Sequence, residues 1–286
     1  MKHPALSLAP LALAALLAGC AGGPPPLRID TSHVSANQDS RVQFLVLHYT
    51  VLDHDRSLKV LTQGGMVSSH YLVRDQPPTI YRLVDENRRA WHAGVSYWAG
   101  HTNLNASSIG IEIVNPGYTD TPDGRVYAPF PPAQIDAVIR LSKDIVARHG
   151  IKPDRIVGHA DIAPGRKQDP GPMFPWKQFA EAGLIAWPDA AQVQAKLPLY
   201  ALQPPDLAWA QERLARIGYN VPRHGQPDQL TQEGIVSFQM KYRPAKYDGQ
   251  LDAETAALLE VAASPGGMVM LVPQPDSGPK PYTSRW

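Results

Sequence analysis

Three polar side chains stand at or near the ends of apolar segments that have the length of buried strands. His48 follows FLVL, Glu112 lies within IGIEIV, and His159 follows RIVG. In an α/β sheet the strand ends open into the crevice where ligands bind, so these side chains are expected to face a common site. A single histidine at such a place is usually a satisfied core residue. Two histidines with a carboxylate favour a functional site instead.

The segment that follows His159 carries a further carboxylate. Its sequence over 158–172, GHADIAPGRKQDPGP, is rich in proline and glycine, which predicts a loop without a helix that returns over the strand end. Asp169 can thereby meet His159. Two histidines and one aspartate make a three-ligand zinc set that leaves the fourth position open to water. The sequence has no HExxH segment of the kind that common metalloproteases carry on a helix.

The elements that must position these residues alternate between strands and helices. Continuous apolar runs predict buried strands, and apolar residues at helical spacing predict helices that pack on them. The expected elements are strands at 43–49, 109–114 and 155–159, a hairpin of 69–73 with 79–84, a short helix capped by Asp53 or Asp55, and a longer helix through 135–146 that ends at Gly150. This order predicts an α/β fold with a mixed sheet flanked by helices.

A smaller unit follows a break at 197–205. One helix is expected from Leu207 to Gly218, and Asp228 and Asp252 each offer a capping side chain just before an apolar helix. These three short helices predict a small C-terminal bundle. From residue 264 onward Pro, Gly and Ser dominate, which predicts a disordered tail.

Composition narrows the classes of partner. The net charge is +1 and the basic residues form no stripe, which argues against nucleic-acid binding and against electrostatic attraction to anionic membranes. Much of the proline lies in short runs, which is typical of linkers between folded units. The single cysteine, Cys20, excludes an intramolecular disulfide, so the core or a metal must hold the fold.

The N-terminus has the pattern of a processing signal. Lys2 and His3 precede an apolar run over 5–18 that is too short to span a membrane but suits a signal peptide. The run closes with Leu-Ala-Gly-Cys at Cys20, which resembles the cleavage box of bacterial lipoproteins; an ordinary signal with a stray cysteine is the alternative. The resemblance implies a lipidated Cys20, and Ala21 after it favours the Gram-negative outer membrane, facing the periplasm.

Five segments together resemble a known enzyme family. They are VLHYT, SSHYLV, AWHAG, SIGIEIVN and GHADIAPGRKQDPGP, spread over 41–183. They are similar to the zinc-dependent N-acetylmuramoyl-L-alanine amidases of type 2, and most of all to their outer-membrane lipoprotein branch. The resemblance implies the fold of peptidoglycan recognition proteins. It also implies hydrolysis of the amide between the lactyl group of (anhydro-)N-acetylmuramic acid and L-alanine, in peptidoglycan or muropeptides.

The same resemblance assigns roles to individual residues. It implies that His48, His159 and Asp169 hold one Zn²⁺ per chain, that Glu112 is the general base, and that Lys167 stabilises the developing oxyanion. Some relatives have cysteine at the position of Asp169. Others have a catalytic tyrosine where this chain has Ser69, which leaves the acid–base work to Glu112.

Weaker expectations concern the substrate. Trp91 and His92 resemble the family's pocket wall, and Asn115 follows the Glu112 strand, so all three are expected to contact substrate. The C-terminal bundle resembles the peptidoglycan-binding modules of wall hydrolases, although Leu251 replaces their usual glycine. Such a module is expected to raise the local concentration of enzyme on the wall without taking part in chemistry.

The resulting organisation has six segments. They are a signal peptide at 1–19, a tether at 20–40, a catalytic domain at 41–185, a linker at 186–203, a peptidoglycan-binding module at 204–263 and a tail at 264–286. The expected partners are peptidoglycan or muropeptides and, through the lipid alone, a membrane; no nucleic acid and no obligate protein partner is expected. The rival interpretations are a non-catalytic peptidoglycan receptor on the same fold and, more remotely, a glycosidase with paired carboxylates.

Overall fold

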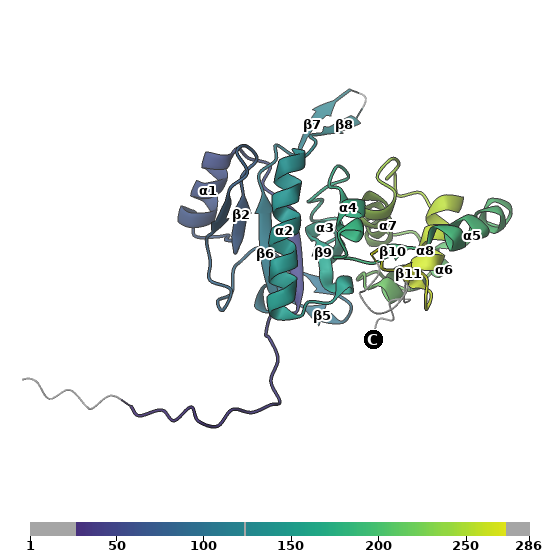
Figure 1. The fold of residues 1–286 in the computed structure, drawn as a ribbon. Helices are drawn as coiled ribbons and strands as arrows, with labels where there is room; N and C mark the ends of the chain where they lie inside the picture. Colours follow the sequence, from purple (N-terminus) through teal and green to yellow (C-terminus); the bar gives the residue numbers. More distant parts are fainter. Residues whose placement is uncertain (1–26, 123, 273–286) are drawn as a thin grey trace, which may run out of the picture. The chain divides into compact units, whose positions relative to one another are not determined.

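A computed structural model describes residues 27–122 and 124–272 (Figure 1). Residues 27–39 belong to a separate N-terminal unit and are exposed, without helix or strand. The expected signal peptide, Cys20 and the end of the expected tail lie outside the described residues. Within the described part of the chain, no helix is both long enough and apolar enough to cross a membrane.

A five-stranded sheet forms the centre of the second unit, which begins at Ser40. Its order is β3-β2-β6-β1-β9, and all neighbours are parallel except the β2–β3 hairpin. The strands are β1 (Phe44–Tyr49), β2 (Tyr71–Val73), β3 (Ile80–Arg82), β6 (Ser108–Ile113) and β9 (Ile156–Gly158). The central strands are buried on both faces, which explains their continuous apolar sequences.

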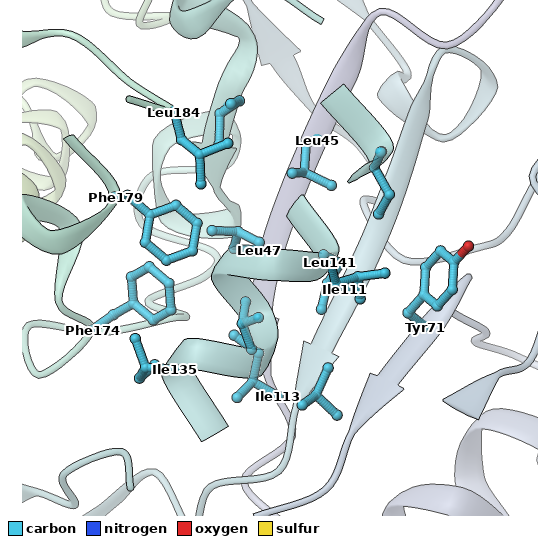
Figure 2. Close-up of a cluster of buried hydrophobic side chains, with 14 of the residues drawn as sticks. Leu45, Leu47, Tyr71, Ile111, Ile113, Ile135, Leu141, Phe174, Phe179 and Leu184 are labelled. Atoms are coloured by element: carbon cyan, nitrogen blue, oxygen red, sulfur yellow. The ribbon is translucent and has the colours of Figure 1, made fainter. Parts of the chain in front are cut away.

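One face of the sheet packs against α2 (Pro132–His149) and α4 (Trp176–Glu181). Figure 2 shows side chains of β1 and β6 meeting Ile135 of α2 and the rings of Phe174 and Phe179. Phe179 has no exposed surface, and truncation of a phenylalanine buried in this way costs about 3–5 kcal/mol. This layer is the main core of the segment that the sequence predicts to be the catalytic domain.

The other face of the sheet packs against the C-terminal helices. Phe44, Val46 and Val157 point away from α2 and share a buried cluster with residues such as Leu214 and Phe238. The helices of this side are α5 (Ala190–Leu202), α6 (Leu207–Ile217), α7 (Gln229–Tyr242) and α8 (Ala253–Ala263), which lie together in Figure 1. The expected module is therefore not separated from the sheet, because the two have one continuous core.

Local capping places the helix ends as the sequence predicts. The side chain of Asp53 accepts from the N–H of Arg56 at the start of α1 (His54–Gln63). Asp228 and Asp252 cap α7 and α8 in the same way. Helix α2 ends at Gly150, whose φ of 66° suits glycine.

Shorter elements connect these layers. They are β4 (Tyr97–Trp98), β5 (His101–Thr102), η1 (Leu104–Ala106), β7 (Tyr118–Thr121), β8 (Gly124–Tyr127), η2 (Pro153–Arg155), α3 (His159–Ile162), β10 (Trp187–Pro188) and β11 (Met268–Val269).

The expected linker and the expected tail both differ from the sequence predictions. The expected linker at 186–203 contains β10 and helix α5, which packs against α8 although Pro198 lies inside it. Asp189 caps this helix, and burial of Val193 and Tyr200 stabilises it, so tertiary packing outweighs the effect of proline. In the expected tail, β11 pairs with β10, which orders the first residues after 264.

Candidate metal centre

The alternation of side chains in two neighbouring strands places His48 beside Glu112. Leu45 and Leu47 of β1 point toward α2, so His48 points to the opposite face; in β6, Ile111 and Ile113 do the same and leave Glu112 on that face. The parallel register pairs His48 with Glu112. Both side chains therefore reach the same end of the sheet, as the sequence predicts.

The segment after β9 supplies the other two residues. His159 begins α3, a single helical turn that corrects the prediction of a loop without any helix. The turn forms because Asp161 accepts a hydrogen bond from the Gly158 N–H (2.9 Å), and it ends at Ala163, before the next proline. The backbone N–H of Ala160 then donates to the carbonyl of Asp169 (2.9 Å), which holds the returning loop against α3.

Three buried atoms converge at this point. Nδ1 of His48 lies 3.0 Å from Nδ1 of His159 and 2.9 Å from Oδ2 of Asp169, and the remaining pair is 3.1 Å apart. The exposed fractions of the three residues are 1%, 3% and 8%. Ligand atoms about 2.0–2.1 Å from a tetrahedral ion lie about 3.3 Å from one another, so the triangle is close to the size that a metal ion requires.

A chain of hydrogen bonds fixes the tautomer of His48. The hydroxyl of Ser108 donates its only proton to the carbonyl of Leu104 (2.6 Å), so its oxygen must accept from Nε2–H of His92 (3.1 Å). Nδ1 of His92 then carries a lone pair and accepts from Nε2–H of His48 (3.0 Å). Nδ1 of His48 is consequently left with a lone pair that points at the other two ligand atoms.

The tautomer of His159 follows from a similar argument. Its Nε2–H donates to the carbonyl of Ala93 (3.0 Å), so Nδ1 bears the lone pair. Arg166 donates to the same carbonyl (2.8 Å). The 3.4 Å distance between its guanidinium and Nε2 of His159 therefore separates two donors that share one acceptor. Three acceptor atoms thus face one another with no hydrogen between them. This donor set fits a cation.

The pKa of His48 agrees with such a set. Burial, reinforced by the neighbouring His159, lowers this pKa to about 4, so the imidazole is neutral at pH 7. A neutral imidazole is the protonation state in which a histidine binds a metal.

A cavity of about 230 Å³ opens beside the candidate metal site and is lined by two of its three residues, His159 and Asp169. Glu112 and Lys167 both line it. Glu112 is half-buried as a residue, but its Oε2 atom is shielded from solvent and has no hydrogen-bond partner among the residues that the structure describes. Burial, and then the charge of Asp169, raise the pKa of Glu112 well above its usual range. The cavity thus brings a carboxylate of raised proton affinity and a lysine to the metal site.

The three residues expected to contact substrate lie in different surroundings. Trp91 lines the cavity with half of its surface exposed, and the guanidinium of Arg89 lies 4.0 Å from its ring centre. His92 also lines the cavity, but both of its ring nitrogens are engaged within the protein, so it supports His48. Asn115 is buried, and its amide bonds to the backbone of Gly117, Ala128 and Pro129, so the structure gives no support to a substrate contact there.

Sequence reasoning missed the residues behind the ligands. Ser108 lies on the same face of β6 as Glu112, so the alternation of the strand was a signal that a second polar side chain points toward the site. Gly110, between them, must be glycine because a Cβ there would lie 2.5 Å from Cγ of His92. The Ala93 carbonyl could not be found from residue types, because every residue carries one.

Comparison with known proteins identifies the family. Residues 38–172 match the N-acetylmuramoyl-L-alanine amidase family, and residues 203–259 match a family of peptidoglycan binding domains. The chain is 48% identical over 265 residues to the N-acetylmuramoyl-L-alanine amidase AmiD of Escherichia coli K12, which covers 87% of this chain and 94% of AmiD. The chain belongs to the N-acetylmuramoyl-L-alanine amidase family. The family and the enzyme class predicted from the sequence are therefore confirmed.

Solved structures of relatives confirm the fold of this amidase. The complex of E. coli AmiD with anhydro-N-acetylmuramic acid-L-Ala-D-γ-Glu-L-Lys superposes with a TM-score of 0.76 at 48% identity, over 81% of this chain and 92% of AmiD. AmpDh3 of Pseudomonas aeruginosa, in complex with an anhydromuramic pentapeptide, gives 0.76 at 41% identity, over 82% of this chain and 97% of AmpDh3. Proteins that act on the cell wall typically combine an amidase domain with a peptidoglycan binding domain, as this chain does.

Proposed function

We propose that this amidase uses one zinc ion to hydrolyse the amide between the lactyl group of N-acetylmuramic acid and L-alanine. The substrates are peptidoglycan and its muropeptides, including anhydro fragments of the kind bound by the solved relatives. The observation that carries the proposal is the convergence of Nδ1 of His48, Nδ1 of His159 and Oδ2 of Asp169, which lie 2.9–3.1 Å from one another. Nitrogen and oxygen donors in this number are a common zinc set.

The residues around the ligands would complete the reaction. When bound, zinc would acidify a water molecule and draw electron density from the amide carbonyl. Glu112 faces the same cavity, and its raised pKa would suit it to take a proton from the attacking water and to return that proton to the amide nitrogen as the C–N bond breaks. A positioned base of this kind contributes about 10²–10⁴-fold to the rate.

Lys167 is suited to stabilise the charge that develops on the carbonyl oxygen. It lines the cavity and lies two residues before Asp169 on the ligand loop. Its backbone N–H donates to the carbonyl of Ala163 (3.0 Å), which anchors the loop to the end of α3. An ammonium group aimed at a developing oxyanion acts most strongly in the transition state, where the negative charge is largest.

We also propose that the amidase is a lipoprotein of the outer membrane, facing the periplasm. The support is the Leu-Ala-Gly-Cys sequence ending at Cys20 and the alanine that follows it. The exposed residues 27–39 then connect the anchor to the catalytic domain. A lipid anchor and a peptidoglycan-binding module together would hold the active site between membrane and wall.

Zinc content and product mass test the proposal together. The purified chain is expected to hold one zinc and to release L-alanyl peptides from muropeptides, with mass spectrometry locating the cut. His159→Ala should lose both zinc and activity, because two ligands do not retain the ion. His224→Ala, at a half-exposed position in the module, is the matched control and should keep both. Full zinc content in His159→Ala would remove that residue from the ligand set.

A further inference from the structure

A buried carboxylate, Asp161, joins the segment 159–169 that carries His159 and Asp169 (the metal loop) to the C-terminal helices α6, α7 and α8 (the helical module). Asp161 is 2% exposed and accepts four hydrogen bonds. Its Oδ1 accepts from the hydroxyls of Tyr219 (2.8 Å) and Ser237 (3.2 Å), and its Oδ2 accepts from Nζ of Lys241 (3.0 Å) and from the N–H of Gly158 (2.9 Å). Three of these donors belong to the module, and the fourth precedes the ligand His159. Asp161 therefore bridges the two parts of the chain.

Asp161 belongs to helix α3, which positions two of the three candidate ligands. Helix α3 begins with His159, and the N–H of its second residue, Ala160, holds the carbonyl of Asp169. The contact is tight, since a Cβ on Gly158 would lie 2.8 Å from Cδ of Pro170. A shift of α3 would move His159 and Asp169 together relative to His48 on β1.

Lys241 supplies the charge that keeps Asp161 in place. Lys241 is only 6% exposed, and its ammonium lies over the ring of Trp176 at 4.2 Å from the ring centre. Removal of the cation would leave a buried carboxylate without its charged partner, which is a strongly unfavourable state. The structure around Asp161 would have to rearrange, and α3 is the element to which Asp161 belongs.

Apolar packing supports the same connection. Ile162 and Ala163, at the end of α3, share a buried cluster with Tyr219, Ile235 and Phe238 of the module. Polar contacts of Asp161 and part of the apolar contacts of α3 thus come from the module, on the face of the sheet opposite to α2.

We propose that the helical module is part of the metal centre, with Lys241 as a positioning residue that fixes α3 through Asp161. The inference rests on the zinc site proposed above. It adds a role for the module that is distinct from binding peptidoglycan: the module sets the distance between His48 and the other two ligands, and hence the affinity for zinc. Groups that orient metal ligands from outside typically change metal affinity by about 10–100-fold.

The test compares two buried cations of the module. Lys241→Met removes the charge that faces Asp161. Arg243→Met is the matched control, because Arg243 is equally buried (5% exposed) and pairs with Asp252 inside the module (2.7 Å). The affinity of the full chain for zinc is measured by competition with a chelator, and the visible spectrum of the cobalt-loaded chain reports the ligand geometry. Urea unfolding of each metal-free variant gives its stability.

Lys241→Met is expected to weaken zinc binding by about tenfold or more and to alter the cobalt spectrum. Arg243→Met should lower the stability of the chain but leave the affinity and the spectrum unchanged. Tyr219→Phe, which removes one donor to Asp161 with little change in volume, should weaken zinc binding by about threefold. This variant carries the test if Lys241→Met does not fold.

Three results would overturn the inference. Zinc affinity and a cobalt spectrum equal to the parent's in folded Lys241→Met, or in Tyr219→Phe where only that variant folds, would show that the module does not position α3. An equal loss of affinity in Arg243→Met would reduce the effect to general stability. A parent chain that binds no zinc would overturn the proposed function as well, so the two failures are distinguishable.

Discussion

The carboxylate of Glu112 is held in an environment that opposes its charge, and replacing it with glutamine should affect activity and stability in opposite directions. The shielded Oε2 atom has no hydrogen-bond partner within the described part of the chain, and burial together with the charge of Asp169 raises the pKa of Glu112. Glutamine has nearly the same shape but no charge. Glu112→Gln is therefore expected to keep zinc, to lower kcat by about 10²–10⁴-fold, and to stabilise the metal-free chain by about 1–3 kcal/mol at pH 7.

The direction of the stability change follows from the pH dependence of the protonation of Glu112. Because folding raises the pKa of Glu112 above its ordinary value of 4.5, the folded chain holds the proton more tightly than the unfolded chain. The stability contributed by this group is fully present below the unfolded pKa and is lost as pH rises through the folded pKa. The advantage of Glu112→Gln should thus be small at pH 4 and grow above about pH 4.5.

Urea unfolding in the presence of a chelator, at pH 4 and at pH 7, measures this difference, and turnover of a soluble muropeptide measures kcat. Glu181→Gln, on the exposed surface of α4, is the control and should change neither quantity. A stability difference that is the same at both pH values would refute the argument from burial. Near-parental turnover in Glu112→Gln would refute the assignment of the base.

Three further changes test other parts of the site. Lys167→Ala should retain zinc and lower kcat by about 10²–10³-fold, the usual effect of losing one oxyanion donor; kinetics with a zinc assay would check it, and unchanged kcat would contradict the role. Ser108→Ala removes the acceptor for His92 and should weaken zinc binding by about tenfold in a chelator competition, whereas Ser142→Ala, a buried serine of α2, should not. Cys20→Ser should leave the protein out of the outer-membrane fraction of Gram-negative cells; mature protein that still fractionates there would place the anchor elsewhere.

The positions of the three candidate metal ligands were predictable because each depends on a local pattern. The apolar runs around His48 and Glu112 fix which side chains reach the strand end, and proline and glycine after His159 predict a loop that returns with Asp169. Helix α3 was missed because a single turn leaves no periodicity in the sequence. It forms through the Asp161 cap, which the residue types alone do not reveal.

The supporting contacts were not predictable because they join residues far apart in the chain. The chain of hydrogen bonds from His48 through His92 to Ser108 depends on the position of the Leu104 carbonyl, and two of the three backbone partners of Asn115 lie 13–14 residues away. Helix α5 continues past Pro198 because α8 packs against it. Such contacts override local propensity without changing local composition.

The core that the sheet shares with the helical module gives the module a structural role. A parallel sheet needs a layer on each face, and here Phe44, Val46 and Val157 meet the module where α2 meets the other side. A module that acted only through local concentration on the wall could be removed without harm to small substrates. Removal of this one would expose those side chains to water and leave Asp161 without three of its four donors. Binding to the wall and support of the metal loop are therefore best separated by substitutions such as Lys241→Met, which keep the module in place.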